Sequence, residues 1–197
     1  MPCLARPVRP LERHVFLSCG ISEGRETRDD NFGIALLSRW PLTDTQIVVL
    51  GEADVPSIRA DVRPPRRHFT ILATHPVPPV GAEYSRLRNG QIEDAAAFLK
   101  SIPAPVLLVG DLNVSPWSHH FRRLLGAAHL RDSSRGWGVQ PTWPSFNMLL
   151  GVPIDHCLTS PEISILGRQV GPAVGSDHYP LIVDFSLPTD AGEKRHE

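Results

Sequence analysis

Three short polar clusters in this 197-residue chain contain the residue types that carry acid–base and metal-assisted chemistry. They are Gly110-Asp111-Leu112-Asn113, Ile154-Asp155-His156 and Ser176-Asp177-His178-Tyr179-Pro180. A carboxylate beside a histidine can take a proton from water, and carboxylate or amide oxygens can hold a hard divalent cation. Asp and Asn also favour strand ends for conformational reasons alone. Three such clusters in one short chain favour the chemical interpretation, metal-assisted attack of water on phosphorus.

The pattern of apolar residues places each cluster beside a β-strand. Residues 106–109 form a short apolar run, typical of a strand buried on both faces, that delivers Asp111 and Asn113 to its carboxyl end. The alternating run 68–74 predicts another strand, and His75 follows it at a point where several prolines prevent continuation. We therefore expect strand ends to bring these side chains to one rim.

The remaining pattern predicts a mixed α/β fold. Apolar residues recur at helical spacing over 85–100, and Ser115 with Pro116 suits the start of a second helix that runs through Leu125. Runs at 33–38 and 46–50 indicate a hairpin, and further strands are expected at 57–62, around Ile154, at 163–170 and at 181–185.

These motifs resemble those of the endonuclease/exonuclease/phosphatase superfamily, which includes DNase I-like nucleases. The likeness runs in the family's order through Thr74-His75 and the three clusters above, with further similarity at 31–39 and 141–144. It covers the chain from about residue 30 to about residue 185. The resemblance implies a four-layered α/β/β/α sandwich of two packed mixed β-sheets flanked by helices, with the active site at one end.

The chain departs from the family at its start. Residues 1–30 contain neither the family's Asn-bearing first strand nor the Gln-Glu pair whose Glu ligates the metal; Glu12, Glu23 and Glu26 are candidate substitutes. We expect a divergent N-terminal segment (1–30), the family domain (31–187) and a flexible tail (188–197). Loss of the opening strands would expose a sheet edge, which predicts a homodimer paired through that edge. Alternatively, Val15-Phe16-Leu17 could fold back as a substitute strand.

The resemblance also assigns roles to individual residues. Asp155 orients His178 as proton acceptor or phosphate support, and His156 points to the opposite side of its strand. The expected catalytic set is His75, Asp111, Asn113, Asp155 and His178. Substrate contacts are expected from Asn113, Trp143 and Arg88. Mg²⁺, or Mn²⁺, is expected on Asp111, Asn113 and Asp177, because these supply oxygen ligands.

The function expected from these features is divalent-metal-dependent phosphodiester hydrolysis, with DNA or RNA as substrate. A small or lipid-linked phosphate is the enzymatic alternative, because the formal net charge of −1 gives no overall basic field. A module that binds phosphate or a partner protein without turnover is the third. Three cysteines without metal-ligand spacing suggest free thiols, and the apolar runs are too short for a bilayer, so we expect a cytoplasmic protein without membrane contact.

Overall fold

The computed structural model describes residues 14–19, 33–65, 67–103, 105–147 and 150–187. Its largest element is a six-stranded sheet in the order β3-β4-β5-β6-β8-β7. The strands are β3 (Leu42–Val49), β4 (Pro56–Val62), β5 (Phe69–Ala73), β6 (Val106–Asp111), β7 (Arg131–Asp132) and β8 (Asp155–Thr159). Among the strand pairs of this sheet that the structure describes, only β5 and β6 run parallel, because helix α1 (Gly81–Lys100) returns the chain between them.

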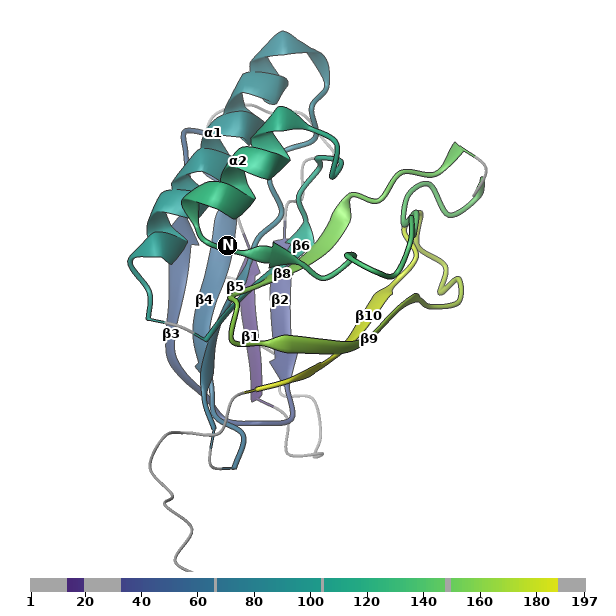
Figure 1. The fold of residues 1–197 in the computed structure, drawn as a ribbon. Coiled ribbons are helices and arrows are strands. Elements are labelled where there is room, and N and C mark those ends of the chain that lie inside the picture. Colours follow the sequence, from purple (N-terminus) through teal and green to yellow (C-terminus); the bar gives the residue numbers. More distant parts are fainter. Residues whose placement is uncertain (1–13, 20–32, 66, 104, 148–149, 188–197) are drawn as a thin grey trace, which may run out of the picture.

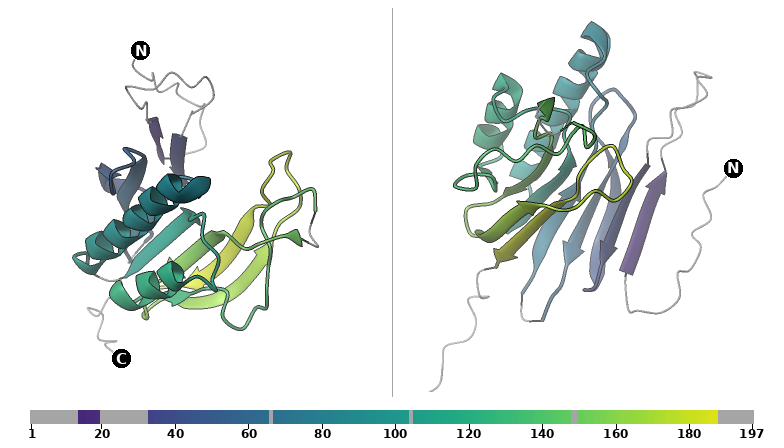
Figure 2. Two further views of the ribbon diagram at one scale, coloured as in Figure 1. Left: turned by 90° about the horizontal axis from the view of Figure 1, so that it is seen from above. Right: turned by 90° about the vertical axis from the view of Figure 1, so that its right-hand side faces the viewer.

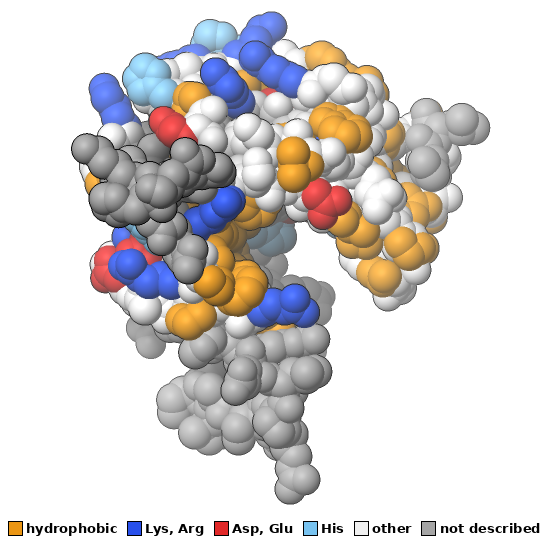
Figure 3. All heavy atoms as spheres, turned by 60° about the horizontal axis from the view of Figure 1, so that its bottom comes forward, with side chains coloured by type: hydrophobic (Ala, Val, Ile, Leu, Met, Phe, Trp, Pro, Cys, Tyr) orange, Lys and Arg blue, Asp and Glu red, His pale blue; other side chains and the backbone are white. Residues whose placement is uncertain are grey.

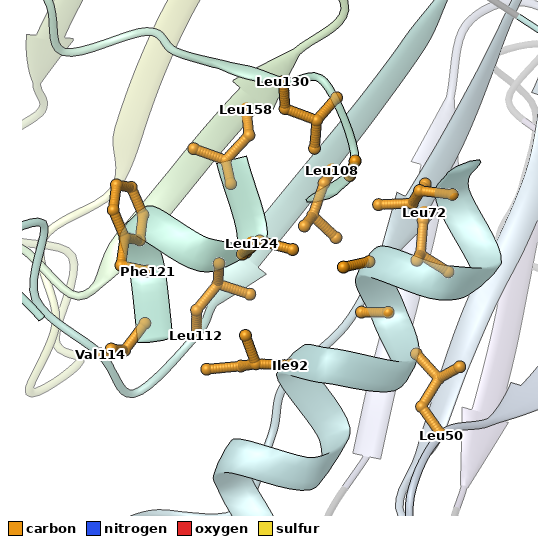
Figure 4. Packing of buried hydrophobic residues seen from close by; sticks show 14 of the residues in the cluster. Leu50, Leu72, Ile92, Leu108, Leu112, Val114, Phe121, Leu124, Leu130 and Leu158 are labelled. Carbon is orange, nitrogen blue, oxygen red and sulfur yellow. The ribbon is translucent and has the colours of Figure 1, made fainter. Parts of the chain in front are cut away.

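Helices α1 and α2 (His119–Ala127) lie together on one face of this sheet (Figure 1). The inward face of α1 presents Ile92, Ala95 and Leu99 at helical spacing, and all three are buried. They pack with sheet residues such as Leu108 and with Phe121 of α2 in the larger hydrophobic core (Figure 4). This core fixes β6, the strand that ends at Asp111.

Two antiparallel strand pairs lie along the other face of the sheet (Figure 2). One joins β9 (Ser164–Val170) to β10 (Leu181–Ser186), and the other joins β1 (His14–Cys19) to β2 (Gly33–Ser38). A second core between the layers includes Leu107, Cys157 and Phe185. Burial raises the pKa of the free Cys157 thiol to about 12, so this cysteine is a packing residue.

The hairpin expected over residues 33–50 is wrong. Strand β2 pairs with β1, whereas β3 pairs with β4 in the six-stranded sheet. The intervening Trp40-Pro41 segment therefore carries the chain from one layer to the other. We expected β2 and β3 to pair because strands that are neighbours in sequence often do. Nothing in the sequence between them indicates that they belong to different sheets.

Both helices differ from expectation at their first residues. Helix α1 begins at Gly81 after Val80, whose side chain makes no capping hydrogen bond, so no capping signal marks the start. Helix α2 begins at His119, and the capping oxygen belongs to Ser118, which accepts from the backbone N–H of His120 at 3.2 Å. Ser115 instead accepts a hydrogen bond from the Ser118 backbone through its carbonyl, one turn earlier.

The substitute strand considered for residues 15–17 is present, as part of β1. The candidate residues Glu12, Glu23 and Glu26 and the expected tail at 188–197 lie outside the described residues. In the described ranges, β2 pairs only with β1, and β10 only with β9. Hydrophobic side chains such as Leu37 and Ile182 stay exposed on these two strands. Figure 3 shows one face of the molecule, on which hydrophobic side chains gather around a hollow.

We propose that the free edges of β2 and β10 pair with a second copy of the chain, because unpaired strand edges favour association. Multi-angle light scattering at micromolar protein is expected to give twice the mass of one chain. A single-chain mass at every concentration would exclude the dimer. A matched variant, Leu37→Lys, places a charge on β2 and is expected to lower the dimer fraction.

Within the described residues, no helix is both long and apolar enough to span a bilayer.

Candidate active site

Three strand ends meet at one edge of the six-stranded sheet. Because β5 and β6 are parallel neighbours, their carboxyl ends lie side by side, and they lead to His75 and Asp111 respectively. Strand β8 runs antiparallel to β6 and begins with Asp155, which lies directly opposite Asp111 in the ladder. Segments that lie 80 residues apart in sequence, from His75 to Asp155, are thus brought together by strand pairing.

Gly110 allows the close approach of β6 to the end of β5. Its backbone φ is +139°, a value that residues with a Cβ rarely adopt. A Cβ at this position would lie 2.0 Å from the Thr74 carbonyl oxygen. The backbone N–H of Thr74 donates to the Val109 carbonyl at 3.0 Å, which holds the two strand ends together.

The loop after β6 fixes Asp111 and Asn113. Asp111 Oδ1 accepts a hydrogen bond from the Asn113 backbone N–H at 2.7 Å, and Asn113 has a φ of +50°. The Asn113 side chain donates through Nδ2 to the Pro76 carbonyl at 2.9 Å, and its own carbonyl accepts from Arg88. Asp111 Oδ2 therefore remains directed toward the histidines.

His178 is the centre of the polar network. Its Nδ1–H donates to Asp155 Oδ2 at 2.8 Å, which leaves Nε2 3.7 Å from Asp111 Oδ2. His75 Nε2 lies 3.5 Å from the same Asp111 oxygen. A histidine whose Nδ1–H is held by a carboxylate presents the Nε2 lone pair as a proton acceptor. The arrangement can therefore activate water between His178 and Asp111.

A buried threonine holds the loops around this network. Thr142 Oγ1 accepts from the backbone N–H groups of Ile154 and Asp155, both at 3.3 Å, and the Thr142 carbonyl accepts from the Tyr179 N–H at 2.8 Å. Thr142 is fully buried. The sequence analysis assigned Thr142 no role. The resemblance of residues 141–144 to the family was the feature that could have pointed to it.

The predicted site residues, with one exception, line a single cavity of about 780 Å³. These residues are His75, Asp111, Asn113, Trp143, Asp155, Asp177 and His178. The apolar part of the lining includes Pro79, Val80 and Val152, to which the sequence analysis assigned no role in the site. Arg88 is the exception, because its guanidinium contacts the Asn113 carbonyl, and burial lowers its pKa. Arg88 is thus a support for the loop.

Trp143 and Asp177 lie beside His178 in this cavity. The Trp143 indole N–H donates to Asp177 Oδ2 at 3.3 Å, and its ring centroid is 6.4 Å from that of His178. Trp143 is 39% exposed, so one face is open to a bound group. An exposed aromatic face beside polar groups is suited to stacking.

The oxygen ligands fit an open metal site. In the parts of the chain that the structure describes, no three His, Cys, Asp or Glu side chains lie close enough to hold an ion between them. Asp155 Oδ2 is bound to His178, whereas Asp111 and Asp177 each keep one carboxylate oxygen that the hydrogen bonds from Asn113 and Trp143 do not use. Mg²⁺ typically binds to one or two carboxylates, several waters and substrate phosphates. The residues present suit that mode.

His156 lies on the opposite side of β8 from Asp155, as the alternation of a strand predicts. Its Nε2–H donates to the Val114 carbonyl at 2.8 Å, and its ring contacts Phe121 at a centroid distance of 4.5 Å. Burial is the largest effect on its pKa and lowers it, so the neutral form is favoured in the folded state.

Lowering the pH from 7.5 to 5.5 is expected to destabilise the fold through His156. Because its folded pKa is depressed, the unfolded chain binds the proton more readily, and stability is lost as pH falls below about 6.5. The slope from one such group is at most about 1.4 kcal/mol per pH unit. Urea unfolding of His156→Asn should show a flatter pH dependence, whereas His119→Asn, at an exposed position, should match the parent. An unchanged slope in the His156 variant would contradict this assignment.

Two curated proteins are similar in sequence to part or most of this chain. A UPF0294 protein of Vibrio vulnificus is 31% identical over 102 residues, which is 51% of this chain and 34% of that protein. Nocturnin of Drosophila melanogaster is 24% identical over 205 residues, which is 81% of this chain and 31% of that protein. The chain spans about a third of the length of these curated relatives.

Solved structures share the fold. The human Nocturnin catalytic domain with bound sulfate aligns with a TM-score of 0.71 and 17% identity over 90% of this chain and 73% of that chain. The 3′ phosphatase NExo from Neisseria, bound to a product DNA hairpin, aligns with a TM-score of 0.66 and 19% identity over 89% and 80%. The predicted sandwich of packed sheets and helices is confirmed.

The family comparison covers most of the chain. The model of the endonuclease/exonuclease/phosphatase family matches residues 4–178. This span includes the ends of β5 and β6, the start of β8 and the loop up to His178. The chain therefore belongs to the endonuclease/exonuclease/phosphatase family, as its motifs predicted.

Proposed function

We propose that this protein is a divalent-metal-dependent phosphodiester hydrolase that cleaves DNA or RNA. The observation that carries the proposal is the hydrogen bond from His178 Nδ1 to Asp155 at 2.8 Å, which leaves His178 Nε2 3.7 Å from Asp111. Asp155 thus orients the His178 ring, and Nε2 of that ring, the proton acceptor, faces the second carboxylate, Asp111. Membership of a family of nucleases and phosphatases supports the reaction class.

The side chains divide the reaction between them. His178 accepts the proton of the attacking water at Nε2, and Asp155 stabilises the imidazolium that forms. Asn113 has a second amide N–H beyond the one donated to Pro76, and this group and His75 can bind phosphate oxygens as charge builds up. Mg²⁺ or Mn²⁺ held by Asp111, with Asn113 and Asp177, would add charge neutralisation at the phosphate.

Two features support a nucleic acid as the substrate. The exposed face of Trp143 beside His178 can stack on a base. The Neisseria relative, which shares the fold, is a 3′ phosphatase bound to a DNA hairpin.

A small or lipid-linked phosphate ester is the second candidate substrate. The apolar part of the lining formed by Pro79, Val80 and Val152 favours it, since a hydrocarbon chain would gain from that contact. Val80 is 75% exposed and is thus available to such a chain. Binding of phosphate without turnover is the third outcome, and the assay below separates all three.

Chelation of divalent ions is expected to abolish hydrolysis, because no Lys or Arg lines the cavity described above to balance charge on the phosphate. The assay measures turnover of plasmid DNA, single-stranded DNA, RNA and bis-p-nitrophenyl phosphate with Mg²⁺, Mn²⁺ or EDTA. The same preparation of Asp111→Asn controls for contaminating nucleases. Cleavage that continues in EDTA and that the Asp111 variant lacks would exclude the proposed mechanism.

A further inference from the structure

Arg168 of β9 is a buried cation that meets no carboxylate among the described residues. It is 4% exposed, its Nε–H donates to Ser133 Oγ at 3.2 Å, and its Nη1 donates to Gln140 Oε1. Asp132 acts on it electrostatically, but the Asp132 oxygens accept from the backbone N–H and the hydroxyl of Ser134 at 2.8 and 2.6 Å. A guanidinium has five N–H groups, so these two hydrogen bonds leave others for a further acceptor.

The charge of Arg168 is only partly compensated. Burial is the largest effect on its guanidinium and lowers its pKa, against the opposing influence of Asp132. Arginine nevertheless stays protonated in proteins. A buried charge without a paired counter-charge is costly, and an anion in contact with it would offset that cost.

A second cavity, of about 120 Å³, opens onto this guanidinium. Ligand pockets for organic molecules usually exceed about 300 Å³, and one water occupies about 30 Å³, so this cavity suits a small ion. Its lining includes the polar side chains of Ser134, Gln140, His156 and Arg168, together with Trp117 and apolar residues such as Val139. Gln140 donates one amide N–H to the Arg168 carbonyl at 3.1 Å and keeps a second for a bound group.

The second cavity lies behind the candidate active site. Asp155 lines the first cavity and its neighbour His156 the second, on opposite sides of β8. Val152, which forms a β-bridge with Trp143, lines the first cavity, and Pro153 lines the second. One stretch of backbone thus separates the two.

We propose that the Arg168 cavity binds a phosphate oxyanion. The planar guanidinium matches the geometry of phosphate oxygens, and its charge acts strongly because the side chain is buried. The phosphate is either free inorganic phosphate or the terminal 5′-phosphate of a polynucleotide. Only the polynucleotide source rests on the proposed function.

Calorimetric titration with inorganic phosphate in EDTA tests the site without requiring turnover. Arg168→Met keeps the length of the side chain and removes its charge, so phosphate should bind at least tenfold more weakly. Gln140→Glu places a carboxylate where Oε1 already accepts from Arg168, so an internal ion pair should displace phosphate to the same extent while preserving the fold. His178→Ala identifies phosphate bound in the first cavity, because binding that this change weakens and that Arg168→Met leaves intact belongs to the first cavity. This control separates failure of the second site from failure of the proposed activity.

The source of the phosphate is tested with oligonucleotides that carry a 5′-phosphate or a 5′-hydroxyl. Tighter binding of the phosphorylated form by the parent, and equal binding of both by Gln140→Glu, would identify the polynucleotide. Equal binding of both forms by the parent, with phosphate still displaced by Gln140→Glu, would identify the free ion. The proposal is overturned if millimolar phosphate does not bind the parent, or if binding survives both changes at Arg168 and Gln140.

Discussion

Replacing His178 with alanine is expected to lower the turnover number at least about a hundredfold, which is the usual effect of removing a positioned general base. The imidazole presents Nε2 to the cavity, and Asp155 holds the other ring nitrogen, so the ring is oriented to accept the proton. The side chain is 24% exposed, and its removal should leave the fold intact. Steady-state turnover on the best substrate of the panel, with circular dichroism, measures both effects.

A second measurement of the same variant separates loss of catalysis from loss of structure. Removal of a general base should lower kcat and kcat/KM together and leave the free energy of unfolding unchanged, whereas a purely structural change would lower all three. His119→Ala, on the exposed side of α2, is the matched control and should retain the parent values. Full activity in His178→Ala would place proton transfer at another residue.

Gly110→Ala is expected to destabilise the protein by more than about 2 kcal/mol. A residue with a Cβ held at positive φ costs about 1–3 kcal/mol, and the added Cβ would also lie 2.0 Å from the Thr74 carbonyl oxygen. The clash can be relieved only by moving β6 away from β5, which would displace Asp111 from His75. Urea unfolding measures the loss of stability, and any folded fraction should be poorly active.

Gly90→Ala is the matched control for this change. Gly90 lies within α1, and a Cβ there meets no atom within 4 Å. Alanine favours the helix over glycine by about 1 kcal/mol, so the control should be more stable than the parent. A Gly110→Ala protein as stable as the parent would contradict the close packing of the two strand ends.

The parts of the fold that follow from local pattern were predictable. The alternation before His75, the helical spacing over α1 and the apolar run of β6 together gave a strand–helix–strand crossover with two polar strand ends at one rim. Alternation on β8 also separated His156 from Asp155. These inferences hold because each depends on a period within one element.

Features that depend on which strands, helices and loops contact each other could not be predicted from the sequence. The sequence around Trp40 does not reveal that β2 and β3 belong to different layers. Helical periodicity does not say which loop each face of α1 meets, so the contact of Arg88 with the Asn113 carbonyl could not be predicted. The support from Thr142 arises between two loops and the start of β8, so no local pattern shows it.

Asp111 lies directly opposite Asp155 in the ladder, and this arrangement serves activity but lowers the stability of the fold. Two like charges on facing positions of adjacent strands repel each other, and both carboxylates border the same cavity. Selection for a more robust fold would favour the loss of one of them, and selection for turnover would favour keeping both. A lineage released from the need for catalysis would therefore be expected to lose one acidic residue from this pair early, and descendants that had abandoned the chemistry could be recognised by that change.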